Sequence, residues 1–303
     1  DDYLRRKTDN YYYLNEKDRK FQKEDAFSGV ELVTDAHRLA LMNARLHGME
    51  SSIHLNDTLT EFGKTQKNYD GVLANPPFGT KKGGERPTRD DFTFPTSNKQ
   101  LNFLQHIYRS LKKDGKARAA VVLPDNVLFE DGDGQRIRKD LMDKCNLHTI
   151  LRLPTGIFYA AGVKTNVLFF TRGKEELNNT QGVWFYDMRT NVPNYGKRTP
   201  FTEKAFEGFV EAYTGGTKVN TLEKEFHGGI DEAKRESIKD ERWQYITRES
   251  IAKKNDSLDL GLIADDSLST ADDLGDPVDI AKEALAELNS ITAQLNAMLK
   301  ELA

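Results

Sequence analysis

The sequence predicts an α/β fold built on a doubly wound, mostly parallel sheet with an antiparallel hairpin at its edge. Short apolar strands alternate with helical patterns between about residues 26 and 188, which is typical of a sheet with helices on both faces. Several strands, such as residues 117–123, are apolar at nearly every position, which indicates burial on both faces. A further helical pattern at the end of the chain predicts a C-terminal helical extension.

The elements follow from apolar spacing and from the residues that stop each run. Strands are expected at residues 26–32, 52–57, 69–74, 117–123, 148–153, 165–171 and 182–188. Helices are expected at residues 34–47, 98–111 and 135–144, and residues 8–25 are expected to form a loop. No helix separates 148–153 from 165–171, so this pair is interpreted as the antiparallel edge hairpin.

The composition and the apolar spacing change along the chain and suggest three regions. Residues 1–200 carry the sheet, residues 201–276 form an irregular, charged connection, and residues 277–303 form an amphipathic helix for subunit assembly. The apolar positions of this helix recur as a heptad seam: Ala284, Leu288, Ile291, Leu295, Met298 and Leu302. A seam behind an acidic linker favours packing on a partner helix, and packing on its own domain is the alternative.

Composition excludes several classes of protein. The 303 residues are 37% apolar and 30% charged with a net charge of −4, and no apolar run could span a bilayer. The single cysteine, Cys145, can form neither an internal disulfide nor a metal cluster, so we expect a packing residue and a cytoplasmic location. The six histidines lack metal-ligand spacing, so no metal site is expected. The acidic balance argues against binding nucleic acid over the whole surface, but allows a local site.

The candidate catalytic residues are Asn75, Pro76, Pro77 and Phe78, at the end of the strand at 69–74. Neither proline has a backbone N–H, so the strand must stop there, at the sheet edge where α/β proteins bind ligands. The Asn75 side-chain oxygen and a proline carbonyl can hold a base amino group while Phe78 stacks on the ring. This tetrapeptide is typical of amino-group methyltransferases that use S-adenosylmethionine. The alternative is a Pro-Pro turn with an incidental aromatic residue.

Two acids are expected at neighbouring strand ends. Glu31 ends the first predicted strand and Asp57 the second, at the same sheet edge as Asn75. A carboxylate in this place typically accepts hydrogen bonds from ribose hydroxyls, and a second can accept the adenine amino group of a nucleoside cofactor. Each acid could instead merely cap the turn that follows.

A basic, glycine-rich segment follows the Asn-Pro-Pro-Phe turn directly. Its position favours contact with the DNA backbone, although most charged runs are simply solvated loops. The candidate phosphate-binding residues are Lys81, Lys82, Arg86 and Arg89.

From about residue 26 to residue 200 the sequence resembles the modification subunit of type I restriction–modification systems. The segments that carry the resemblance include Gly29-Val30-Glu31-Leu32, Asn56-Asp57-Thr58-Leu59, Asn75-Pro76-Pro77-Phe78-Gly79, Leu123-Pro124-Asp125-Asn126 and Leu153-Pro154-Thr155-Gly156-Ile157-Phe158. The resemblance implies a Rossmann-like methyltransferase sheet, adenine N6 methylation of DNA, and S-adenosylmethionine as donor. It also implies as partners a specificity subunit, bound through the C-terminal helix, a second modification subunit and a restriction and translocation subunit.

The resemblance also assigns roles to residues. Glu31 is expected at the cofactor ribose, Asp57 at its adenine, and Asn75 at both cofactor and flipped base. Phe78 is expected to stack on that base, and Phe158 is either a second ring contact or a core aromatic. Methylation of protein glutamine or of RNA, and a non-catalytic scaffold, remain the alternatives.

One departure from the family pattern concerns the cofactor. In this family a glycine-rich Asp-Pro-x-x-Gly-x-Gly turn on the first strand holds the methionine part of the cofactor. We would expect this turn just before Asp1, and the motif does not occur in the sequence. We therefore expect the chain to be the C-terminal portion of a larger subunit. By itself this portion is expected to bind cofactor poorly and not to catalyse.

Overall fold

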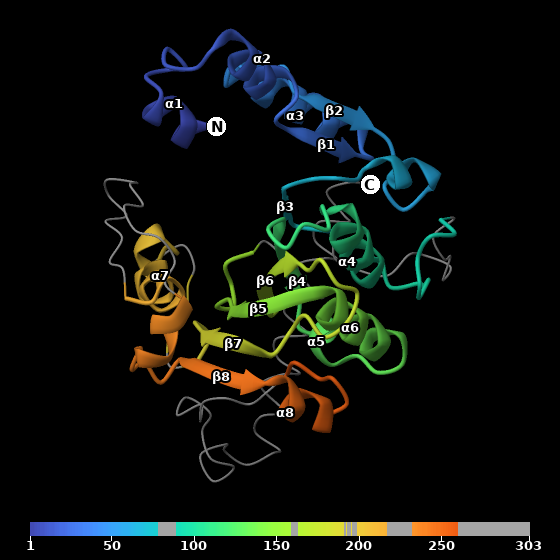
Figure 1. The fold of residues 1–303 in the computed structure, drawn as a ribbon, viewed down its shortest axis with the longest axis vertical. Helices are drawn as coiled ribbons and strands as arrows, with labels where there is room; N and C mark the ends of the chain where they lie inside the picture. Colours follow the sequence, from blue (N-terminus) through green and yellow to red (C-terminus); the bar gives the residue numbers. More distant parts are fainter. Residues whose placement is uncertain are drawn as a thin grey trace, which may run out of the picture.

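The computed structural model describes residues 1–77, 89–158, 163–190, 192, 195, 199–216 and 232–259. The strands of this part form two sheets, a parallel pair near the N-terminus and a larger six-stranded sheet (Figure 1). Within the same residues, no helix combines the length and the apolar character needed to cross a membrane. The helix predicted at 277–303 lies outside the described part of the chain.

The N-terminal unit is a two-stranded parallel sheet with three helices. Its elements are α1 (Asp2–Lys7), α2 (Glu16–Glu24), β1 (Ser28–Glu31), α3 (Thr34–Leu46) and β2 (Ser52–Leu55). His37 Nε2 lies 2.8 Å from the carbonyl oxygen of Ile53, which holds α3 against the strands. The prediction of a loop at residues 8–25 was wrong in part, because α2 lies within this range. Asn15 caps α2 by accepting a hydrogen bond from the Asp18 N–H at 2.8 Å.

The larger sheet has the strand order β3-β4-β6-β5-β7-β8. Its strands are β3 (Gly71–Ala74), β4 (Arg118–Pro124), β5 (Cys145–Arg152), β6 (Thr165–Arg172), β7 (Gly182–Asp187) and β8 (Trp243–Thr247). Strands β3, β4, β5 and β7 run in one direction, and β6 and β8 run against them. The prediction of a mostly parallel α/β sheet is therefore confirmed.

Both faces of the six-stranded sheet are covered, as a doubly wound fold requires. Along β6, Leu168 and Phe170 enter one core, while Val167 and Phe169 pack against a second core that includes Phe209. This two-residue alternation places successive side chains on opposite faces of the strand. The helices around the sheet are α4 (Lys99–Ser110), α5 (Asn126–Phe129), α6 (Asp133–Lys144), α7 (Glu207–Thr214) and α8 (Arg248–Lys253), with 3₁₀ turns η1 (Glu61–Thr65), η2 (Glu203–Phe206) and η3 (Glu232–Ser237).

The antiparallel pair β5–β6 was predicted correctly, but its place at the sheet edge was wrong. Strand β6 pairs with β4 on its other side, and β5 pairs with β7, so both lie inside the sheet. Interior placement suits their sequences, because two long apolar strands at an edge would expose unpaired backbone groups to solvent. Within the described residues, the edges of this sheet are β3 and β8.

The irregular connection predicted at residues 201–276 is in part an ordered continuation of the sheet. Trp243 on β8 stacks on Trp184 of β7 with ring centroids 4.8 Å apart and planes inclined by 6°. Leu258 is buried in the same core as α4 and α6. The expectation of irregular structure was therefore wrong for residues 203–214 and for most of residues 232–253, because aromatic and aliphatic anchors are spaced among the charges.

Cys145 is buried at the start of β5, as expected for a packing residue. Burial raises the pKa of its thiol to about 12 and outweighs the opposing charge of Arg172. A thiol in this state is not a nucleophile near neutral pH.

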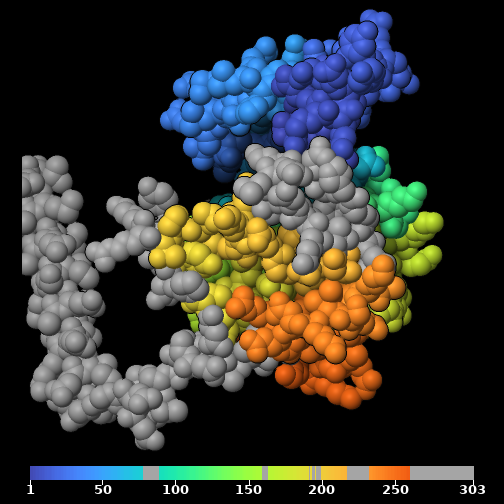
Figure 2. Space-filling model, turned by 90° about the vertical axis from the view of Figure 1, so that its left-hand side faces the viewer, coloured from blue at the N-terminus to red at the C-terminus, as the bar shows by residue number. Residues whose placement is uncertain are grey.

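The N-terminal unit lies beyond the β3 edge of the larger sheet, at one end of the molecule (Figures 1 and 2). Each of β1 and β3 pairs with one strand of its own sheet, and among the described residues no backbone hydrogen bond joins the two. The expectation of one continuous sheet through the first three strands was therefore wrong. The two units instead form the walls of a groove.

Candidate functional site

A groove of about 730 Å³ lies between the N-terminal unit and the β3 edge. The residues that line it come from strand β1 and the turn after it, the turn after β2, the segment with Gln66 and Tyr69, strand β3 with the residues that follow it, and helix α4. The volume lies within the range of pockets that hold small molecules and cofactors.

The two predicted acids face this groove from the N-terminal unit. One carboxylate oxygen of Glu31 accepts a hydrogen bond from the Val33 N–H at 2.8 Å, and one oxygen of Asp57 accepts from the Leu59 N–H at 2.8 Å. Each acid thus stabilises the turn after it, as the capping alternative proposed. The second oxygen of each has no hydrogen-bond partner among the residues that the structure describes, and can accept from a ligand.

Asn75 faces the groove from the opposite wall, directly after β3. Its side chain is exposed and has no partner within the described residues, whereas Pro76 behind it is buried. Pro77 also lines the groove, and Phe78 lies outside the described part of the chain. The turn therefore presents an unpaired amide on a stiff backbone.

The structure brings Glu31, Asp57 and Asn75 to one groove, as the sequence predicted. The reason differs from the one expected, since the three residues lie at or after the ends of strands that belong to two separate sheets. Two carboxylates that can accept from a nucleoside thus lie on one wall, and an amide that can hold an amino group lies on the other.

Phe158 does not line the groove. It is partly buried and packs against the core cluster that includes Leu151, Leu153 and Tyr186. This position supports the alternative that Phe158 is a core aromatic.

Arg89 does not present its charge to solvent, and its predicted role as a phosphate contact needs correction. Only 5% of the residue is exposed, and its guanidinium donates to Asp91, Thr58 and His106. A guanidinium with most of its N–H groups already bonded inside the protein cannot also bind a phosphate. The other predicted phosphate contacts, Lys81, Lys82 and Arg86, lie outside the described residues.

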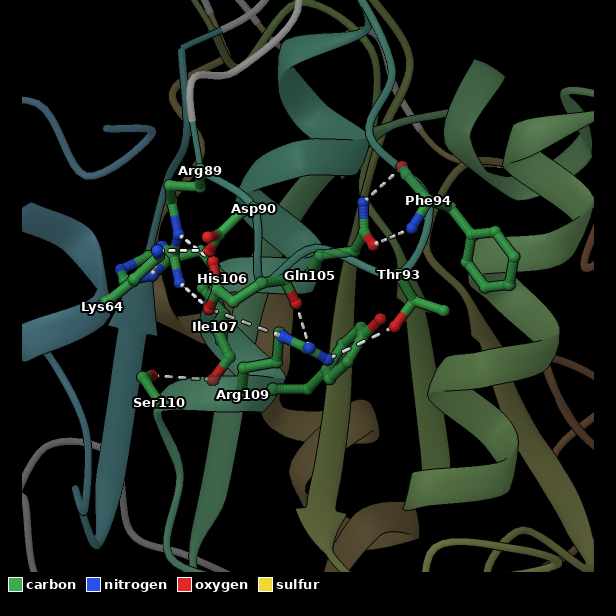
Figure 3. A network of polar contacts seen from close by, with 12 residues as sticks. Lys64, Arg89, Asp90, Thr93, Phe94, Gln105, His106, Ile107, Arg109 and Ser110 are labelled. Atoms are coloured by element: carbon green, nitrogen blue, oxygen red, sulfur yellow. Dashed lines mark hydrogen bonds and ion pairs between the residues drawn. The ribbon is translucent and has the colours of Figure 1, made fainter. Parts of the chain in front are cut away.

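Sequence reasoning missed the contribution of α4 to the groove. Lys99, Phe103 and His106 on this helix line the groove on the side of Asn75. The apolar spacing predicted the helix but not which of its polar residues face a ligand. His106 is also joined to Arg89, in the network that Figure 3 shows.

The pKa of His106 is low. Burial lowers it to about 4, the charge of Arg89 adds to the effect, and the charge of Asp91 opposes it. Burial likewise lowers the pKa of His148, beside α7, to about 3. Both imidazoles are therefore neutral at physiological pH, and His106 Nδ1 accepts the hydrogen bond from Arg89 at 2.8 Å.

These histidines predict a loss of stability in mild acid. The unfolded chain takes up a proton at each near pH 6.5, whereas the folded chain does so only near pH 4 or 3. The free energy of unfolding should therefore be highest above pH 6.5, and fall below it by about 1.4 kcal/mol per pH unit for each histidine. Urea unfolding at pH 7, 6 and 5 measures this slope. His106→Asn keeps an acceptor in the place of Nδ1 and should reduce it; an unchanged slope would contradict the assignment.

The fold is α/β, and one groove is lined by two acids at strand ends and by an Asn-Pro-Pro turn. This combination is the architecture of a class of methyltransferases. The chain belongs to the N-6 DNA methylase family, whose model matches residues 8–258. The resemblance seen in the sequence is confirmed.

Similar proteins are methylase subunits of type I restriction enzymes. The StySPI methylase subunit of Salmonella potsdam and the EcoKI methylase subunit of Escherichia coli K12 are each 44% identical to this chain over its whole length. The chain spans 61% of the length of these curated relatives. The crystal structure of the EcoKI M protein matches with a TM-score of 0.74 at 42% identity, covering 99% of this chain and 65% of that one. A modification subunit from Vibrio vulnificus matches with a TM-score of 0.60 at 28% identity, covering 80% and 49%.

Proposed function

We propose that this chain forms part of a modification subunit that transfers a methyl group from S-adenosylmethionine to N6 of a flipped adenine in double-stranded DNA. The observation that carries the proposal is the meeting of Glu31, Asp57 and Asn75 in one groove. Family membership and the methylase relatives support the same activity.

The groove residues present fit the nucleoside part of the cofactor. The free carboxylate oxygen of Glu31 suits the ribose hydroxyls, and that of Asp57 suits the adenine amino group, because both ligand groups are hydrogen-bond donors. S-adenosylmethionine supplies a methyl group bound to a sulfonium. The chain's residues then need only bind and orient, since no strong base is required for attack on such a carbon.

Asn75 is proposed to hold the amino group of the target adenine. That amino group is paired inside the duplex, so the base must first leave the stack. The Asn75 side-chain oxygen and the Pro76 carbonyl would accept hydrogen bonds from its two N–H groups and orient the nitrogen, while Phe78 would stack on the ring. Catalysis would rest on orientation and on fixed dipoles. Lys81, Lys82 and Arg86 are proposed to contact phosphates of the same DNA.

The proposed partners are DNA, a specificity subunit bound through the helix predicted at 277–303, a second modification subunit and a restriction subunit. Assembly with other subunits is supported by the relatives, which are named as subunits of type I restriction enzymes. A cytoplasmic location is part of the same proposal, because there the complex meets DNA.

The test is to identify the methylated product. The full-length subunit with its specificity partner is incubated with tritiated S-adenosylmethionine and with plasmid DNA, RNA or a glutamine-containing protein. We expect label in DNA only, recovered as N6-methyladenine after digestion to nucleosides. Label in RNA or protein would favour the other substrate classes, and cofactor binding without transfer to any of them would favour a scaffold.

A further inference from the structure

Arg89 is a buried polar link between the N-terminal unit and the elements of the larger sheet. One guanidinium nitrogen, Nη1, donates to the carbonyl oxygen of Thr58 at 2.9 Å and to Nδ1 of His106 at 2.8 Å. Thr58 belongs to the turn after β2, and His106 belongs to α4. Both residues line the groove, from opposite walls.

The other polar links between the two units are more exposed. The Tyr69 hydroxyl lies 3.4 Å from Ser28 Oγ in an exposed contact, and Lys64 pairs with an Asp90 carboxylate that is 82% exposed. Arg89, by contrast, is 5% exposed. Among the residues that the structure describes, it is the link in which water competes least for the hydrogen bonds.

The guanidinium of Arg89 is itself held in place. Its Nε and Nη2 donate to the two carboxylate oxygens of Asp91 at 2.8 and 2.7 Å, and its Cζ lies 4.4 Å from the centre of the Phe92 ring. The hydrogen bond from Arg89 lowers the pKa of Asp91, so this carboxylate stays ionised. A bidentate pair with a stacked ring fixes both the position and the orientation of the fork.

Gly63 shows how closely the chain packs around this link. A Cβ atom at Gly63 would lie 1.9 Å from the Thr58 carbonyl oxygen and 2.6 Å from Nη1 of Arg89. The first neighbour is backbone, which cannot move aside without shifting the turn. The turn that carries Asp57 is therefore held between Gly63 and Arg89.

We propose that Arg89 is a positioning residue that sets where Asp57 stands relative to Asn75. It holds the Thr58 carbonyl, next to Asp57, against α4, which lines the wall that carries Asn75. Arg89 thereby fixes the distance between Asp57, which contacts the adenine of the cofactor, and Asn75, whose amide orients the amino group that accepts the methyl group. This inference rests on the proposed function, and it assigns Arg89 no contact with cofactor or DNA.

The test compares cofactor affinity in four variants of the full-length subunit. Arg89→Met should weaken binding of S-adenosylmethionine and of 5′-methylthioadenosine by about tenfold each, because both use the adenine contact. Arg89→Lys should fall between Met and wild type, since it keeps one charge but not the fork. Arg109→Met is the matched control. Arg109 also bonds to Asp91 but does not reach Thr58. The Arg109→Met variant should therefore bind both ligands with nearly the affinity of wild type.

Gly63→Ala disturbs the same turn without removing the charge, and should also weaken both ligands. Circular dichroism and urea unfolding of each variant show which proteins are folded during titration. If the folded Arg89→Met and Gly63→Ala variants bind both ligands as tightly as wild type does, Arg89 has only a structural role and the inference is overturned. If wild type itself binds no S-adenosylmethionine, the proposed function fails instead, so the two failures are distinguishable.

Discussion

Replacing Asn75 with alanine is expected to reduce methyl transfer to DNA by about 10²–10³-fold, the usual effect of removing one preorganised polar group from a catalytic site. The side chain is exposed to the groove, and none of the described residues bonds to it, so its loss leaves no buried group unsatisfied. The free energy of unfolding should therefore change little. The effect should fall on kcat, because the amide orients the acceptor nitrogen in the transition state.

The measurement is single-turnover transfer of tritiated methyl groups by the full-length subunit with its specificity partner, together with equilibrium binding of S-adenosylmethionine. Asn75→Asp is the matched variant. It keeps an acceptor oxygen in the same place, and it should retain more activity than Asn75→Ala. Cofactor affinity should change much less than the rate in both. A rate near that of wild type in Asn75→Ala would show that this side chain does not orient the base.

The site was more predictable than the sheet that carries it. Glu31, Asp57 and Asn75 could be recognised because each stands at or just past the carboxyl end of a short strand, and such positions meet wherever the strands run the same way. They meet in the structure even though β1 and β3 belong to different sheets. The prediction depended on strand direction, which the alternation with helices implies, and not on which strands pair.

Strand pairing was harder to predict, because it depends on contacts between distant residues. The sequence at 165–171 is apolar on both faces, but this pattern does not say whether one or two strands flank it. Strand β8 was missed because it has only five residues, begins at Trp243 and lies within a charged region. The burial of Trp243 depends on its stacking with Trp184, which is distant in the sequence. Arg89 was misread for a related reason: a basic residue in a glycine-rich segment gives no sign of the buried partners Asp91 and His106.

Replacing Arg138 with methionine is expected to destabilise the fold by about 3 kcal/mol. Arg138 lies on α6 with 1% of its surface exposed, and its guanidinium donates to three backbone carbonyls. These are the oxygens of Val127 at 3.1 Å, Glu130 at 2.8 Å and Asp256 at 2.8 Å. Methionine fills a similar volume but donates nothing, and each buried carbonyl left without a partner costs about 1–3 kcal/mol. Burial also lowers the pKa of Arg138 to about 10, and relief from burying this charge offsets part of the loss.

Arg136→Met provides the control on the same helix. The Arg136 side chain is 65% exposed and lies 3.4 Å from an Asp133 carboxylate oxygen, so its loss should change the free energy of unfolding by less than about 0.5 kcal/mol. Urea unfolding of the chain measures both variants, and equal slopes against urea would show that the same surface is exposed on unfolding. Similar midpoints for the two variants would mean that the three carbonyls find other partners. A large shift in Arg138→Met alone would confirm that the buried guanidinium of Arg138, which joins α6 to the carbonyls of Val127, Glu130 and Asp256, contributes to the stability of the fold.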